Sequence, residues 1–158
     1  MSTHSAPTYT ILVGTMTGTA EIVAEEIAYA LEQSGATATR LDMSGLAPAV
    51  FARPGRFIIC TSTYGSGDVP DNAKAFYESL MAQKPDLSQV QYAVFGLGDS
   101  TYQQTFCFGP KKFDALLESL GATRLTETFL HNASGGTLPE EDCLEWIRPL
   151  LADSAATA

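Results

Sequence analysis

Residues 9–35 read YTILVGTMTGTAEIVAEEIAYALEQSG, and this stretch decides the fold class. Its first five residues are mostly apolar and β-branched, which predicts a short strand. After a turn rich in glycine and threonine, the apolar residues of 20–34 change to helical spacing. Val23, Ile27 and Leu31 then share one face, and Gly35 suits the end of the helix. A strand that runs through a tight turn into a helix is typical of a β-α-β unit.

The same alternation continues along the chain. Further strands are expected over 37–41, 57–61, 92–95 and 124–130, helices over about 73–80 and after residue 110, and a small helical turn within 42–54. Residues 137–140 read as a capping box that starts a last helix, which should bury Leu144, Ile147 and Leu151. Alternating strands and helices predict a parallel sheet with right-handed crossovers. Five strands predict one doubly wound α/β domain over 1–158, a three-layer sandwich with a core of about 9–151 and strand order 2-1-3-4-5.

The composition and charge of the chain limit which binding partners and which cellular compartment are expected. The 158 residues include 9 Lys and Arg against 18 Asp and Glu, a net charge of −9, and no Lys or Arg precedes Arg40. An acidic chain is a poor match for nucleic acid or an anionic membrane, so neither is expected as a partner. The sequence shows no signal peptide and no membrane span, and its 3 cysteines include no CxxC pair. A cytoplasmic protein without a metal site is expected.

Three loops could form a binding site, because they follow the first, third and fourth predicted strands. The carboxyl ends of these strands meet where the strand order reverses, and ligands of doubly wound sheets bind there. The first loop, residues 14–20, carries three threonines before a helix N-terminus, which can bind a phosphate-like anion. It is neither a Walker loop nor a GxGxxG loop, and an ordinary threonine-rich turn is the alternative.

The other two loops carry aromatic and flexible residues. In residues 61–72, Tyr64 could lie flat on a planar ligand, and Gly65 would allow a positive φ. In residues 96–102, Asp99 and exposed N–H groups could bind the polar edge of a ring, and Tyr102 offers a second aromatic face. A packed tyrosine and a structural turn are the simpler alternatives. Together the three loops describe a site for a planar phosphorylated ligand.

The segments 15–21, 62–72 and 98–102 with Phe106 and Cys107 resemble the three cofactor loops of the flavodoxin family, which binds FMN. They are most similar to short-chain, MioC-like flavodoxins and to the FMN domains of diflavin reductases, and the resemblance implies the flavodoxin-like fold. It also implies which residues contact FMN. The phosphate would be held by Thr15, Met16, Thr17, Gly18, Thr19 and Ala20, and the ribityl chain would be approached by Ser62 and Thr63. Tyr64 and Tyr102 would stack on the ring system and Gly65 would lie beside N5, while the pyrimidine edge would be met by Leu97, Gly98, Asp99, Phe106 and Cys107. Two departures are Ala20, where a hydroxyl is common, and one extra residue within 102–107.

The resemblance implies a monomeric one-electron carrier and not an enzyme. Such a protein needs no acid, base or nucleophile, and the sequence contains no GxSxG motif, Cys–His pair or histidine cluster. Its partners would be basic-faced redox proteins, a flavodoxin reductase-like donor and an acceptor enzyme. An NAD(P)H:quinone-type flavin reductase on the same fold is the alternative, although the sequence shows no insertion that would build a substrate pocket. An interaction module that has lost FMN is a further alternative.

Overall fold

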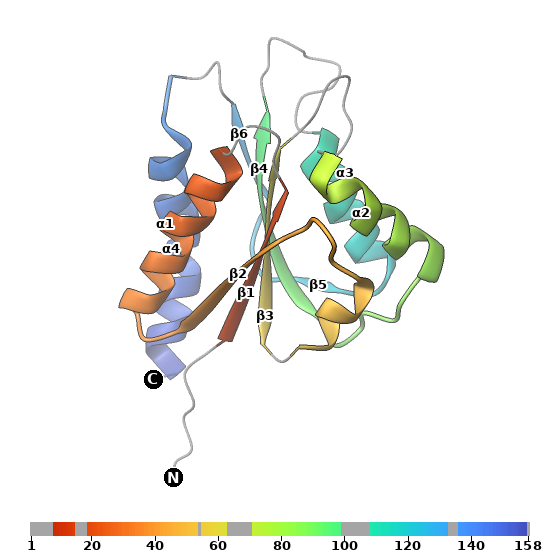
Figure 1. Ribbon diagram of the computed structural model, residues 1–158. Helices are drawn as coiled ribbons and strands as arrows, with labels where there is room; N and C mark the ends of the chain where they lie inside the picture. The colour runs from red at the N-terminus through yellow and green to blue at the C-terminus, as the bar shows by residue number, and fades with distance from the viewer. Residues whose placement is uncertain are drawn as a thin grey trace.

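The structure of the protein, a computed structural model, describes residues 8–14, 19–53, 55–62, 71–98, 108–132 and 136–157. Its centre is a parallel sheet in the order β2-β1-β3-β4-β5, with a further strand, β6, pairing with β4 (Figure 1). The strands are β1 (Thr8–Gly14), β2 (Thr37–Asp42), β3 (Arg56–Ser62), β4 (Gln91–Gly98), β5 (Thr123–Arg124) and β6 (Phe129–Asn132). The predicted doubly wound fold and strand order are confirmed.

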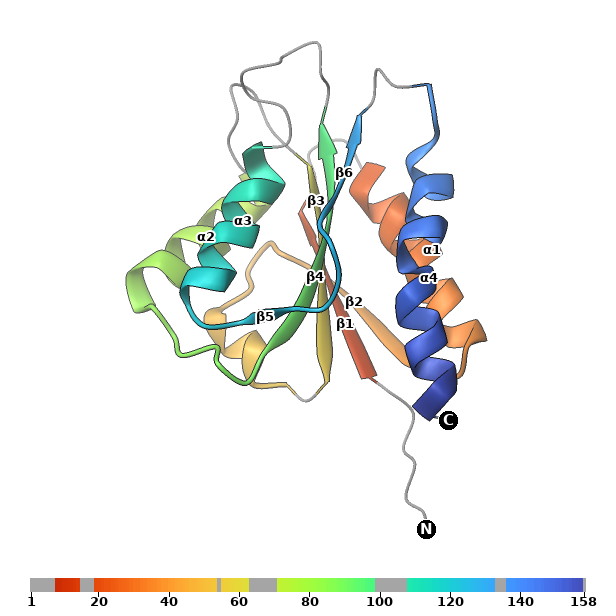
Figure 2. The ribbon, with the colours of Figure 1, turned by 180° about the vertical axis from the view of Figure 1, so that it is seen from behind.

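Helices cover both faces of this sheet and complete the three layers. They are α1 (Thr19–Gln33), the 3₁₀ helix η1 (Pro48–Ala52), α2 (Asp71–Gln83), α3 (Phe108–Ser119) and α4 (Pro139–Thr157). α1 and α4 lie on one face, and α2 and α3 lie on the other (Figures 1 and 2). None of the helices in the described part of the chain is both long and apolar enough to cross a membrane.

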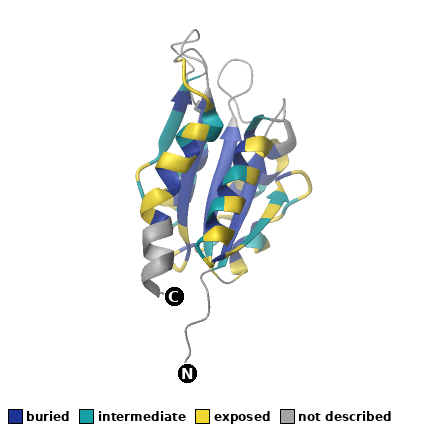
Figure 3. Cartoon of the chain, turned by 90° about the vertical axis from the view of Figure 1, so that its left-hand side faces the viewer, coloured by how far each residue is buried: buried dark blue, intermediate teal, exposed yellow. Residues whose placement is uncertain are grey.

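Apolar periodicity explains why the layers pack as they do. Val23, Ile27 and Leu31 of α1 are fully buried, as their spacing predicts, and α1 presents its exposed residues to solvent (Figure 3). α1 ends at Gly35, whose φ of 97° is the left-handed conformation that glycine adopts readily. The N–H of Ala36 then donates to the carbonyl of Leu31 at 3.0 Å, which closes the last turn.

Side chains on the two faces of β3 pack into two separate hydrophobic cores. Ile58 and Cys60 belong to the cluster under α1 and α4, whereas Phe57 and Ile59 belong to the cluster under α2 and α3. All four side chains are at most 1% exposed. The continuous apolar run of 57–60 is therefore a central strand buried on both sides, as expected for a parallel sheet.

The single fifth strand expected over 124–130 is wrong, because the structure divides it into β5 and β6 (Figure 2). Between them the indole N–H of Trp146 donates to the carbonyl of Glu127 at 2.8 Å, and the hydroxyl of Thr128 donates to Asp114 at 2.7 Å. These bonds come from α4 and α3, so neighbouring helices hold the main chain at Glu127 and the side chain of Thr128. β4 consequently pairs with β5 near its start and with β6 near its end.

Three local expectations also need correction. Residues 71 and 72, expected in a loop, are the first turn of α2. In α4, Leu144 is 40% exposed, and the buried positions are Cys143, Trp146, Ile147 and Leu150; the side chain of Leu151 lies outside the described part. Trp146 takes the inner face because its indole reaches the carbonyl of Glu127. The hydroxyl of Thr137, expected to cap the helix, donates to the carboxylate of Asp142 at 2.8 Å.

Candidate functional site

The carboxyl ends of three strands meet at one edge of the sheet. Gly14 at the end of β1 lies opposite Thr61 of β3, and Ser62 at the end of β3 lies opposite Leu97 of β4. From β1 the chain passes first to β2 on one side and then to β3 on the other, so the strand order reverses between β1 and β3. Doubly wound proteins bind their ligands outside the sheet at such a point.

The N-terminus of α1 is held at this same edge. Ala20, in the first turn of α1, is completely buried, and the thiol of Cys60 on β3 donates to its carbonyl at 3.2 Å. The free N–H groups and the dipole of a helix N-terminus favour an anion such as a phosphate. The first turn of α1 is thus positioned for the phosphate role that the sequence predicts.

Gly14 is required at the end of β1 by close packing. A Cβ atom added at this position would lie 2.7 Å from Thr61 Oγ1, 2.9 Å from Met43 Sδ and 3.1 Å from Ala73 Cβ. Each of these distances is shorter than an ordinary contact between heavy atoms, which is about 3.5–4.0 Å. The absence of a side chain therefore lets the chain leave β1 in direct contact with β3 and α2.

The structure places five of the predicted cofactor residues at this edge: Thr19, Ala20, Ser62, Leu97 and Gly98. The side chain of Leu97 is 6% exposed and packs in the core under α1 and α4, so a ligand could contact its main chain only. The same holds for Ala20, for which an N–H contact was predicted. The remaining predicted residues lie outside the described residues: Thr15, Met16, Thr17, Gly18, Thr63, Tyr64, Gly65, Asp99, Tyr102, Phe106 and Cys107.

A polar cluster beside the end of β4 was not predicted from the sequence. His131 of β6 lies opposite Leu97, is 4% exposed, and donates from Nδ1 to Asp142 Oδ2 at 2.7 Å. Thr137 donates to the same oxygen. No metal-ligand spacing marks these residues, and the part of the chain that the structure describes contains no group of three metal-binding side chains. Only the fold brings them together.

Two buried thiols lie under α1. Cys60 and Cys143 are both free and completely buried. Burial raises the pKa of both thiols, and for Cys143 nearby carboxylates, Glu26 first among them, add to the effect and bring the pKa to about 12. Both thiols therefore remain protonated at neutral pH, and their chemistry is that of small apolar core residues.

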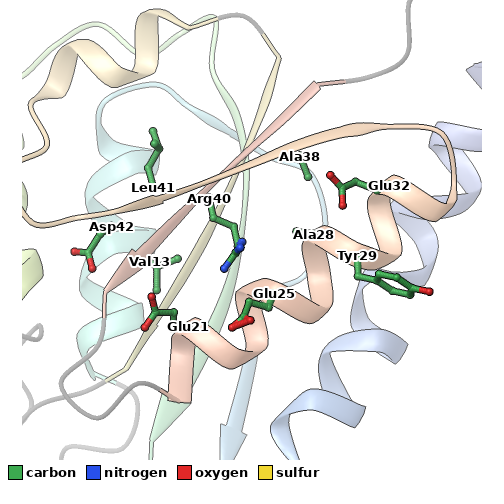
Figure 4. Close-up of a pocket in the computed structure, with 10 residues that line it drawn as sticks. All are labelled: Val13, Glu21, Glu25, Ala28, Tyr29, Glu32, Ala38, Arg40, Leu41 and Asp42. Atoms are coloured by element: carbon green, nitrogen blue, oxygen red, sulfur yellow. The ribbon is translucent and has the colours of Figure 1, made fainter.

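A separate groove of about 620 Å³ lies between α1 and the edge strand β2 (Figure 4). It is lined by the carboxylates of Glu21, Glu25, Glu32 and Asp42 and by one guanidinium, that of Arg40. Arg40 extends from β2 toward α1 in Figure 4. The groove therefore gives this side of the molecule a negative charge next to the first turn of α1.

Comparison with known proteins agrees with this geometry. A family model described as Flavodoxin matches residues 11–146. The chain is 39% identical over 140 residues to Protein MioC of Escherichia coli strain K12, covering 87% of this chain and 92% of that protein. It is 40% identical over 118 residues to the NADPH sulfite reductase flavoprotein alpha-component of Bacillus subtilis, covering 74% of this chain and 19% of that protein. A solved structure of a mutant flavodoxin from Pseudomonas aeruginosa superposes with a TM-score of 0.79 at 33% identity, covering 95% and 97% of the two chains.

The chain belongs to the flavodoxin family, an FMN-binding class of electron-transfer domains. FMN is accordingly its cofactor. The described residues fit this group, because the α1 N-terminus meets the strand ends at the point of reversal, where a flavin phosphate needs N–H donors. Glu21, the acidic residue in the first turn of α1, lines the groove facing β2.

Proposed function

We propose that this protein is a one-electron carrier that accepts electrons from a reductase and passes them to an acceptor enzyme. The observation that carries the proposal is the meeting of the α1 N-terminus with the ends of β1, β3 and β4 in a flavodoxin-family chain. A bound flavin supplies the redox chemistry, and the protein supplies binding, orientation and electrostatics. Residues 1–158 form one domain in this proposal.

The proposed cofactor contacts follow the three loops. The threonines and N–H groups of 15–20 hold the phosphate, and Ser62 and Thr63 approach the ribityl chain. Tyr64 and Tyr102 enclose the ring system, and Gly65 allows its peptide to rotate toward N5. The pyrimidine edge is met by Leu97, Gly98, Asp99, Phe106 and Cys107. The described positions of Thr19, Ser62 and Gly98 at one sheet edge support this arrangement.

The proposed partners are redox proteins with a basic face, a flavodoxin reductase-like donor and an acceptor enzyme. The groove between α1 and β2 supports this part of the proposal, because its four carboxylates outnumber its one guanidinium. A net charge of −9 would steer a basic partner toward a brief encounter. The proposal includes a monomer in the cytoplasm, where thiols such as Cys60 and Cys143 stay reduced.

The first test is a titration of the purified protein with FMN. We expect a shifted flavin absorbance spectrum and quenched flavin fluorescence, because aromatic side chains stack on the ring. Tyr102→Ala should raise the Kd for FMN by about 5- to 150-fold, since the loss of one stacking ring commonly costs about 1–3 kcal/mol. Tyr29→Ala is the matched control, because Tyr29 is 61% exposed on α1 and lines the groove.

Two results would contradict the proposal. Equal FMN affinity of the Tyr102→Ala protein and the wild type would refute the stacking role. Steady NADPH oxidation by the isolated protein in the presence of a quinone would instead indicate a flavin reductase. A carrier should oxidise NADPH only after a reductase is added.

A further inference from the structure

β6 is a short edge strand that extends the sheet along the last four residues of β4. Ser62 at the end of β3 lies opposite Leu97, whereas Gly98 lies opposite Asn132 of β6. β6 has four residues, and the described part of the sheet pairs it with β4 alone (Figure 2). All four residues of β6 pair with β4, and the side-chain contacts of the strand add to this pairing in holding its position.

Two side chains anchor β6 at its two ends. Phe129 stacks on Phe95 of β4, with ring centroids 5.1 Å apart and planes 5° from parallel. His131 donates from Nδ1 to Asp142 Oδ2 at 2.7 Å, which ties the end nearer the site to the first turn of α4. The stacked pair fixes the start of β6, and the imidazole fixes its end.

The geometry of the His131 contact makes it a firm anchor. The imidazole is 4% exposed and the Asp142 side chain 20%, so water competes weakly for the bond. The hydroxyl of Thr137 donates to the same Asp142 oxygen at 2.8 Å, and two donors on one oxygen fix the orientation of the carboxylate. Hydrogen bonds to charged groups are about twice as strong as those between neutral groups.

We propose that His131 is a positioning residue of the FMN site. Through Asp142 it holds β6 against β4, and this contact fixes Leu97 and Gly98, two described residues at the start of the third predicted loop. The inference rests on the proposed function, because it assumes that Leu97, Gly98 and Asp99 meet the pyrimidine edge. Loss of the bond lets the end of β4 move and weakens FMN binding, and this effect requires no contact between His131 and the flavin.

The test compares His131→Leu with His131→Asn. The amide nitrogen of asparagine takes the place of Nδ1 and can still donate to Asp142, whereas leucine cannot. The Kd is measured from the fluorescence of FMN released when the holoprotein is diluted, at a temperature at which circular dichroism shows every variant folded. We expect the leucine variant to raise the Kd about tenfold and to change the visible circular dichroism of the bound flavin, and the asparagine variant to stay within about threefold of the wild type.

Thr128→Val is the matched control for stability. Thr128 lies in the same segment and loses a side-chain hydrogen bond of 2.7 Å to Asp114, but it precedes β6 and lies outside the pairing with Leu97 and Gly98. We expect this variant to unfold more easily while its Kd for FMN stays at the wild-type value. Asp142→Ala replaces His131→Leu if the leucine variant does not fold, because it removes the acceptor of the same bond.

Three results would overturn the inference: a wild-type Kd for His131→Leu, an equal loss of affinity for the leucine and asparagine variants, or an equal loss for Thr128→Val. A wild-type protein that holds no FMN would overturn both the inference and the proposed function. Failure of the carrier function alone would show differently, as normal FMN binding without electron transfer to an added acceptor.

Discussion

Replacing Gly14 with alanine should disturb both the stability of the sheet and the site beside it. The added methyl group would lie 2.7 Å from Thr61 Oγ1 and 2.9 Å from Met43 Sδ. Thr61 and Met43 are completely buried, so neither can move into solvent. Ordinary contacts at about 3.5–4.0 Å require these atoms to separate from the new methyl group by roughly 0.6–1.3 Å.

Overpacking of this kind typically costs about 1–3 kcal/mol. For a domain of this size each kcal/mol lowers Tm by about 2–4 °C, so Gly14→Ala should unfold about 2–12 °C below the wild type. Thermal and urea unfolding followed by circular dichroism measure the loss, at one fixed FMN concentration because bound FMN raises Tm. FMN affinity should fall as well, since Gly14 leads directly into the predicted phosphate loop.

A double-mutant cycle with Thr61→Ala tests the stated cause. Removing Oγ1 takes away the nearest obstacle, so Gly14→Ala should cost less in that background, by about 0.5–3 kcal/mol of coupling. Overpacking would be refuted as the cause if the free energy of unfolding of Gly14→Ala lay less than about 0.5 kcal/mol below that of the wild type, because ordinary surface substitutions fall within this range. Purely additive effects would also refute it.

Three further predictions concern the polar network, the thiols and the surface charge. Tyr92→Phe should lower the free energy of unfolding in urea by about 1–3 kcal/mol, because the Tyr92 hydroxyl donates to the Asp114 carboxylate at 2.6 Å; a loss under about 0.5 kcal/mol would contradict this. The folded-state pKa of Cys143 is raised to about 12, above its unfolded value of about 9, so its contribution to stability is complete below about pH 9 and is lost as the pH rises toward 12. In Cys143→Ala the free energy of unfolding, measured in urea, should therefore fall less steeply above pH 9. An unchanged slope would show that ionisation of Cys143 does not cause the decline. Electron transfer from the dithionite-reduced protein to cytochrome c, a basic acceptor, should slow as ionic strength rises from about 0.01 M to 0.15 M, because the Debye length falls from about 30 Å to about 8 Å; a rate indifferent to salt would exclude electrostatic steering.

The alternation of strands and helices and the edge of the sheet at which the candidate site lies were predictable from the sequence. Helical spacing in 20–34 and the apolar run of 57–61 predict α1 and β3 because the period of buried residues differs between helices and strands. Once the elements alternate, the handedness of the crossovers leaves few arrangements of the sheet. The strand ends that precede the three loops then meet at one edge of the sheet.

Other features depend on contacts between residues far apart in the chain. β5 and β6 separate because Trp146 and Asp114, on helices from both faces of the sheet, bind the main chain and Thr128 between the two strands. No local sequence pattern in 124–130 identifies Trp146 and Asp114 as partners of this segment. Trp146 likewise decides which face of α4 is buried. The expected burial of Leu144 is therefore wrong.

The sequence by itself determined the class of fold, the family and the edge of the sheet at which FMN is proposed to bind, because periodicity and loop composition are local properties. Only the tertiary structure decided that Gly14 must lack a side chain, since Thr61, Met43 and Ala73 approach it from three other parts of the chain. The same is true of the bond between His131 and Asp142, whose residues carry no motif. Close packing and buried hydrogen bonds join residues that chain order separates, and folding is what brings their atoms into contact.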